Sequence, residues 1–270
     1  MENNSLNNLE IQSVNLDINE DIISSLKTEI YKRSKFEYNS NVVTIPKYFY
    51  RFIGIKNNEK DYYENLHSLD SELKKIGSGY MRFDGGLDKD ISIRLQNVLN
   101  DIWMKVFKRE VLDVSLIINL ISDNGLFPNL SNKVLLQQIK NNLKGLIEYY
   151  IKSNETMDNH KIKVIINYMI HWINIYSKEL FEKFDYMKIN PKVVFYGDIS
   201  REEVFYLILL STLGCDILYF NPKNAGTFYE IDKYNAFSNE IVYNCNYEIK
   251  PFPTNIEDRI KTTADRKSVV

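Results

Sequence analysis

The stretch from Val193 to Gly226, VVFYGDISREEVFYLILLSTLGCDILYFNPKNAG, limits the possible folds of this chain more than any other feature. It begins with a short β-branched and aromatic run, typical of a buried parallel strand, and Cys215–Phe220 predicts a second such strand. An apolar helix is predicted between them. Strands joined in this way lie parallel with a right-handed crossover. The stretch therefore predicts an α/β fold with a Rossmann-like parallel sheet, and helical patterns upstream add a largely helical insertion or subdomain.

Both ends of the predicted helix carry residues that favour helix termini. Ser200 with Glu203 three residues later is a capping-box pattern, in which each side chain accepts a hydrogen bond from the other residue's backbone amide. The helix is therefore predicted to begin at Arg201. Gly214 supplies the left-handed conformation that ends many helices.

The loops that follow the two strands are predicted to leave the sheet at the same edge. Open parallel sheets bind ligands at the edge formed by the carboxyl ends of their strands. A helix N-terminus and a lysine at that edge would attract a phosphate or carboxylate group. The sequence therefore predicts a ligand-binding edge, for which the candidate residues are Gly197, Asp198, Ser200, Asn221, Lys223 and Asn224.

The same residues also have a structural interpretation. The sequence contains no glycine-rich dinucleotide-binding motif and no phosphate-binding loop motif, and most α/β domains have a capped helix after a strand. Ser200 and Glu203 therefore fit plain helix caps better than ligand contacts. Asp198 fits two roles, orienting a ribose hydroxyl, a metal or a base, or bonding its own backbone in the turn. The pattern assigns no catalytic residue and no cofactor.

Other residues that often carry chemistry are poor candidates here. His67, His160 and His171 are far apart and have no cysteine or histidine partner at a metal-binding spacing, so no metal site is predicted. His171 lies beside a tryptophan on an apolar helix, as is typical of a packing residue. Cys215 begins a strand and is predicted to be a small core residue rather than a nucleophile.

Charge and hydropathy disfavour several classes of partner. The formal charge is -2, from 34 basic and 36 acidic residues, which disfavours binding to nucleic acid or to an anionic membrane surface. The longest apolar run, Val204–Leu210, is far below the roughly 20 residues that cross a bilayer, so no membrane span is predicted. Two cysteines and no charged-then-apolar leader predict a cytoplasmic location.

Shifts in composition divide the chain into successive segments. Polar sequence without a sustained apolar period opens it, apolar residues recur at steps of three or four in its middle, and β-branched runs follow. We therefore predict a mobile polar leader with one short helix at 1–44, the strand and helix that start the α/β domain at 45–90, a helical block of three or four helices at 91–190, and the strand–helix–strand region at 191–264.

The start of the α/β domain can be predicted in more detail. Tyr48–Ile55 is aromatic and β-branched and predicts a strand, and Tyr62–Ile76 predicts a helix. The glycine-rich segment that follows, GSGYMRFDGGLDKD, predicts a loop or hairpin that turns at Gly85 and Gly86.

Several segments together resemble a bacterial family. The pieces VVFYGDISREEVFYLILLSTLGCDILYFNP, FYEID, RFIGI before a KDYY helix start, and FPTNIEDRIKTTA are similar to YceG-like proteins, over most of Pro46 to Ala264. The resemblance implies a component of a tellurite-resistance or toxic-compound stress system, one part of a "biosynthetic module" beside other predicted enzymes. It implies other proteins of a stress-resistance operon as partners, and it brings no agreed catalytic residues.

The end of the chain has a separate interpretation. Residues 265–270, DRKSVV, match one reading frame of a widely used sequencing adaptor and are interpreted as a scar. The resemblance implies longer relatives, so the sequence looks like an N-terminal fragment. The predicted helix at Val204–Leu213 is apolar on nearly every face and needs cover on both sides. One of these covers is expected from missing sequence.

Two functions from different classes follow. In the first, the α/β core binds a small phosphorylated ligand, nucleotide-like or a sugar phosphate, at the edge formed by Asp198 and Asn221, and catalyses a group transfer. In the second, the chain is a non-catalytic interaction protein whose helices between Ile91 and Phe184 bind partners of the same system.

Overall fold

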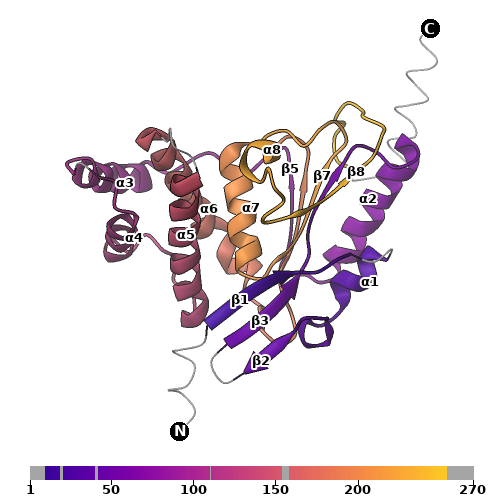
Figure 1. Cartoon of the computed structure of the whole chain (residues 1–270), viewed down its shortest axis with the longest axis horizontal. Coiled ribbons are helices and arrows are strands. Elements are labelled where there is room, and N and C mark those ends of the chain that lie inside the picture. Colours follow the sequence, from indigo (N-terminus) through magenta and orange to yellow (C-terminus); the bar gives the residue numbers. More distant parts are fainter. Residues whose placement is uncertain (1–9, 19–20, 40–41, 110, 154–157, 254–270) are drawn as a thin grey trace.

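The computed structural model describes residues 10–18, 21–39, 42–109, 111–153 and 158–253 of the 270 residues. Figure 1 shows the arrangement of its elements. In chain order they are β1 Glu10–Asn15, α1 Ile22–Lys27, the 3-10 helix η2 Ile30–Lys32, β2 Glu37–Asn39, β3 Val42–Lys47, β4 Phe49–Ile53, α2 Glu59–Lys74, β5 Tyr80–Asp84, α3 Ile93–Val106, α4 Val114–Asp123, α5 Lys133–Ser153, α6 Asn159–Leu180, β6 Lys192–Tyr196, α7 Arg201–Thr212, β7 Asp216–Asn221, α8 Phe228–Ile231 and β8 Asn239–Val242.

A five-stranded sheet lies at the centre of the molecule, with strand order β5-β6-β7-β4-β8. Every neighbouring pair in it is parallel, so the carboxyl ends of all five strands lie at one edge. Helix α2 covers one face of the sheet and α7 covers the other (Figure 1). The predicted α/β class with a parallel sheet is therefore confirmed.

The predicted strand–helix–strand unit is formed by β6, α7 and β7. Helix α7 begins at Arg201, and the capping box is present: the Glu203 amide donates to Ser200 Oγ at 3.4 Å, and the Ser200 amide donates to Glu203 Oε2 at 2.7 Å. Gly214 ends the turn after α7 with φ +91°. A Cβ on Gly214 would lie 3.1 Å from two carbons of Ile45, so both the backbone conformation and the packing favour glycine there.

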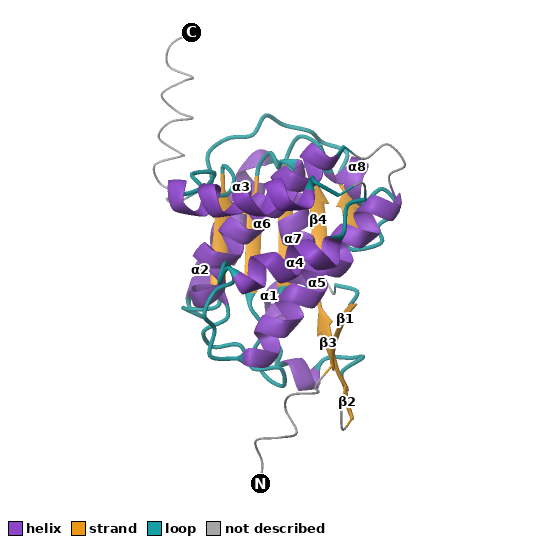
Figure 2. Cartoon of the chain, turned by 90° about the vertical axis from the view of Figure 1, so that its left-hand side faces the viewer, coloured by secondary structure: helices purple, strands orange, loops and turns teal. Residues whose placement is uncertain are grey.

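Helix α7 is buried on all sides. Its residues Val204 to Leu210 are each at most 1% exposed. The sheet covers one side, and α5 and α6 pack against the other. Figure 2 shows these helices in front of the strands. The cover that sequence analysis expected from missing sequence is thus supplied by α5 and α6, because the helical block folds back onto α7.

The helical block consists of α3, α4, α5 and α6, which lie in the chain between β5 and β6. The two strands are neighbours in the sheet, so the block is a long crossover between adjacent parallel strands. Buried residues of α5 recur at steps of three or four, as predicted, and include Leu135, Ile139, Leu143 and Leu146. Helix α3 ends at Val106 and α4 begins at Val114, and the sequence pattern does not indicate this separation.

The glycine-rich segment after α2 was predicted as a loop or hairpin, and this prediction is wrong for its first half. Tyr80–Asp84 is the edge strand β5 and pairs in parallel with β6. Its partner lies more than a hundred residues further along the chain, so no local pattern could indicate the pairing. Gly85 and Gly86, with φ +90° and +102°, make the turn after the strand rather than the turn of a hairpin.

The described part of residues 1–44 contains more regular structure than the predicted leader with one short helix. Strands β1 and β2 both pair with β3, which begins at Val42, in a second sheet of order β1-β3-β2. The sequence did not indicate β1 and β2 because these strands are largely polar and only one of their residues, Ile11, is buried. Residues 265–270 lie outside the described residues, and the boundaries at 45–90, 91–190 and 191–264 stay predictions.

Candidate functional site

The loops after β6 and β7 lie side by side at the carboxyl edge of the sheet, as predicted. The Asn221 side chain joins them. Its Nδ2 lies 3.1 Å from Gly197 O, 3.3 Å from Asp198 Oδ1 and 3.0 Å from the Tyr219 hydroxyl oxygen. Its Oδ1 accepts the amides of Lys223 at 2.8 Å and Asn224 at 3.1 Å. The structure therefore brings five of the six candidate residues into one hydrogen-bonded group.

Within this group Asn221 and Asp198 differ in accessibility. Asn221 is 1% exposed, and both ends of its amide are bonded to protein groups. It holds the two loops together and presents no free polar atom. Asp198 is exposed, and the same amide orients its carboxylate. Lys223 is half-exposed, with Nζ 3.5 Å from Glu248 Oε2.

Glu203 links a third loop to the same edge. Its Oε2 accepts the Ser200 amide in the capping box, and its Oε1 accepts the Leu87 amide at 2.7 Å. Gly86 has φ +102°, and a Cβ there would lie 2.8 Å from Glu203 Oε1, so both the backbone conformation and the close approach favour glycine in the loop after β5. The capping pattern predicted half of this arrangement. The hydrogen bond from the Leu87 amide depends on β5 lying beside β6, and the sequence did not predict that pairing.

The loop after β5 is also bonded to α6. Trp172 Nε1 donates to Asp88 O at 2.5 Å, and the Asp88 amide donates to the Tyr176 hydroxyl at 3.1 Å. His171 Nε2 lies 3.9 Å from Asp88 Oδ1 and has no hydrogen-bond partner among the described residues. Burial lowers the pKa of His171. The expectation of an ordinary packing histidine thus holds for its burial, and the described structure leaves its Nε2 without a hydrogen bond.

A segment without helix or strand, Tyr243–Pro253, crosses the carboxyl edge after β8, and we refer to it as the strap. Its backbone bonds to the ends of two strands. Ile55 N donates to Cys245 O at 2.7 Å, and Tyr247 N donates to Pro222 O at 2.9 Å. Ile249 lies over Gly197, with a carbon 3.8 Å from where a Cβ would be. The strap therefore lies over the part of the carboxyl edge that is formed by the ends of β4, β6 and β7.

The opposite, amino edge of the sheet holds a buried group of charges. Asp216, 1% exposed, accepts two hydrogen bonds of 2.8 Å from Arg33 and one of 2.9 Å from the Tyr48 amide, and lies 2.8 Å from Lys192 Nζ. Burial alone would raise the pKa of Asp216, but the charges of Arg33 and Lys192 outweigh it and hold the pKa at about 2. Cys215, the adjacent residue, is fully buried, and burial raises the pKa of its thiol, as fits a core residue.

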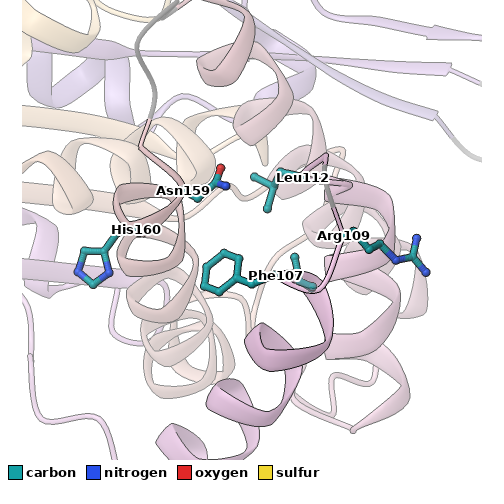
Figure 3. A pocket seen from close by; sticks show the side chains of 6 residues that line it. Phe107, Arg109, Leu112, Asn159 and His160 are labelled. Atoms are coloured by element: carbon teal, nitrogen blue, oxygen red, sulfur yellow. The ribbon is translucent and has the colours of Figure 1, made fainter.

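A hollow of about 290 Å³ lies in the helical block between the end of α3 and the start of α6. Figure 3 shows the Phe107 ring beside this hollow, whereas the side chains of His160 and Arg109 point away from it. A neighbouring hollow of about 660 Å³ shares Arg109 and Leu112 with it. The first hollow is lined mainly by apolar groups, without a convergent set of polar groups.

Metal and membrane sites can be judged within the described ranges. There, no group of three or more His, Cys, Asp or Glu side chains could hold a metal ion. Over the same ranges the structure contains no helix long and apolar enough to cross a membrane.

The fold and its edge define a class: an α/β protein with a five-stranded parallel sheet and a four-helix crossover between two adjacent strands. The model of the YceG domain family matches residues 17–269, and the chain belongs to this family. A relative, the uncharacterized protein YceG of Bacillus subtilis (strain 168), is 25% identical over 227 residues, which are 81% of this chain and 40% of that protein. The chain thus spans about two fifths of that relative's length. No solved structure matches the chain.

Proposed function

We propose that the chain is a component of a bacterial system of resistance to tellurite or other toxic compounds. In this system its α/β core binds a small phosphorylated ligand, a nucleotide or a sugar phosphate, at the carboxyl edge and takes part in a group transfer. Membership of the YceG domain family supports the proposal, since the resemblance in sequence implies such a system.

The observation that carries the ligand site is the placement of Asp198. It is an exposed carboxylate at the end of a central parallel strand, and the buried Asn221 amide orients it. Most polar groups around it are bonded to one another, so an exposed and oriented carboxylate is available for an external group. A sugar hydroxyl or a hydrated cation on a phosphate would be a suitable partner for it.

The surroundings of Asp198 also suit the phosphorylated part of such a ligand. The first amides of a helix have no partner within the helix, and α7 begins three residues after Asp198. Lys223 adds a cation, since its ion pair with Glu248 is long and exposed and therefore weak. In this arrangement Asn221 positions the loops, while Asp198 and Lys223 contact the ligand.

The test compares Asp198→Asn with Ser200→Ala in a bacterial strain that lacks its own copy of the gene. The amide of Asp198→Asn keeps the shape of the side chain but not its charge. We expect it to abolish survival on tellurite with an unchanged melting temperature, because the side chain is exposed. Ser200→Ala, at matched expression, should survive. Full survival of Asp198→Asn would exclude the ligand site.

A second candidate function, a non-catalytic interaction protein, is favoured by the surface of α3. Ile93, Met104 and Phe107 are 77%, 61% and 45% exposed, and α3 ends at the hollow of Figure 3. Met104 and Phe107 lie one helical turn apart, and exposed apolar side chains that adjoin in this way mark contacts between proteins. In this case a partner from the same operon would bind α3, Met104→Glu would abolish both its co-purification and survival, and Asp198→Asn would leave both unchanged.

A further inference from the structure

The strap is attached to the molecule unevenly along its length. Its first part continues from β8, and the Tyr243 amide donates to Ile53 O at 2.8 Å. Its middle, residues 244–248, is exposed throughout. There the carbonyl of Cys245 and the amide of Tyr247 accept and donate one backbone hydrogen bond each to the rest of the chain. In the part of the chain that the structure describes, few buried contacts therefore hold the middle of the strap onto the carboxyl edge.

The far end of the strap is anchored by Phe252. The Phe252 ring is 5% exposed and packs edge-on against Tyr196, with ring centroids 5.3 Å apart. The Arg82 guanidinium carbon lies 4.2 Å from the Phe252 ring centroid, a cation–π contact. These two residues lie on the edge strand β5 and on β6, so the strap spans the sheet from β8 to β5.

Polar contacts beside Phe252 complete this anchor. The Tyr196 hydroxyl donates to Lys250 O at 2.7 Å, and His67 Nδ1 lies 3.1 Å from Pro253 O. Lys250 also forms an ion pair with Glu59 of α2. Among the described residues, most of the contacts that hold the far end closed thus lie within four residues, Lys250 to Pro253, after a middle part that is weakly held.

Gly54 shows that the edge beneath the strap is shaped for it. Gly54 has φ +79°, and a Cβ there would lie 2.6 Å from the Tyr243 carbonyl oxygen and 2.9 Å from that of Cys245. A side chain at this position could not coexist with the closed strap. The backbone just after β4 therefore approaches the strap as closely as only glycine allows.

We propose that the strap is a gate that opens and closes over the carboxyl edge, with its hinge after β8 and Phe252 as its releasable anchor. When the strap is closed, it covers the ends of β4, β7 and β6, while Asp198 stays exposed. When Phe252 leaves Arg82 and Tyr196, the rest of the edge is uncovered. The inference rests on the proposed function in that the gated surface is the proposed ligand site, although the opening itself requires no ligand.

Hydrogen–deuterium exchange of the whole chain tests the gate without a ligand. The Ile55 and Tyr247 amides bond across the gap between strap and edge, so they exchange only when the strap opens. We expect Phe252→Ala to raise their exchange rates at least roughly tenfold, while amides inside β6 and β7 keep their rates. The matched control is Asn244→Ala, which removes an exposed side chain from the same strap, alters neither reporter residue and should leave both rates unchanged.

Two results would overturn the gate. One is an unchanged exchange rate at Ile55 and Tyr247 in Phe252→Ala. The other is an equal rise throughout β6 and β7, since this would show that Phe252 stabilises the whole fold. Glu59→Gln, which weakens the Lys250 ion pair, should give a smaller rise at the same two amides. Either overturning result, together with loss of survival in Asp198→Asn, would reject the gate and leave the proposed function standing.

Discussion

The two edges of the central sheet carry aspartates in opposite surroundings. Asp216, at the amino edge, is 1% exposed and contacts Arg33, Lys192 and a backbone amide at 2.8 to 2.9 Å. Asp198, at the carboxyl edge, is exposed and accepts one long hydrogen bond of 3.3 Å from Asn221.

The difference separates a structural carboxylate from one that is free to bind. Arg33 belongs to the N-terminal segment next to the small sheet, and Asp216 begins β7, so the buried ion pair joins that segment to the central sheet. A buried charge of this kind must be fully paired, since desolvation is costly. The carboxylate of Asp198 is exposed to water, so its charge does not need such pairing. Stability is therefore expected to depend on the amino edge, and binding on the carboxyl edge.

The largest effect is expected from Asp216→Ala. It leaves the Arg33 and Lys192 cations buried without their partner, and such losses typically cost about 3–5 kcal/mol of stability. The matched variant Asp198→Ala should cost less than about 0.5 kcal/mol, because its carboxylate is exposed. Urea denaturation of both variants measures the contrast. Equal losses would remove the distinction between the two edges.

Asn221→Ala tests the part of the carboxyl edge that is structural. The sequence predicts both Asn221 and Asp198 as ligand residues, but the buried amide of Asn221 bonds to both loops. We expect a loss of about 2 kcal/mol, since the Lys223 and Asn224 amides lose their acceptor. Asn224→Ala, an exposed control in the same loop, should be nearly neutral in thermal melting. A neutral Asn221→Ala would contradict the structural role.

Lys47 gives the amino edge a pH dependence. Burial lowers the pKa of Lys47 from 10.5 to about 8. Between these two pH values the unfolded chain binds the proton that the folded chain has lost, so this residue makes stability rise with pH, by up to about 1.4 kcal/mol per pH unit. In Lys47→Met the rise should become smaller, and the part that remains is expected from Lys192, whose pKa burial also lowers. Denaturation midpoints of both proteins from pH 7.5 to about 10 measure it, and parallel curves would contradict the prediction.

The smallest effect is expected from Ser200→Ala. The hydroxyl accepts one long hydrogen bond of 3.4 Å from the Glu203 amide, and losing an N-cap costs about 1 kcal/mol. Glu203 keeps its bond to the Leu87 amide, so the loop after β5 should stay in place. Thermal melting measures the loss. A much larger loss, or loss of tellurite survival at matched expression, would show that Ser200 does more than cap α7.

Predictions from sequence succeeded where the determining contacts are local. The strand, capped helix and strand from Lys192 to Asn221 were predicted because the capping box spans four residues and Gly214 follows the helix directly. The same holds for α2 and for the helices of the block, whose apolar residues recur every three or four positions. The strand–helix–strand pattern also predicts that β6 and β7 are parallel, and therefore that the loops after them lie at the same edge of the sheet.

Strand β5, the small sheet and the use of each edge residue were decided by tertiary structure. The pair of Arg33 and Asp216 joins residues 183 positions apart, and Glu203 reaches Leu87 across 116 positions. The strap is a polar segment, and only the folded chain shows that it lies over the carboxyl edge of the sheet. A single sequence records which residues can form a helix, a strand or a cap, because these choices depend on neighbours within a few positions. Which charge is buried and which stays exposed depends on packing between distant segments, and for that reason Asp216 and Asp198 are distinguished only in the folded chain.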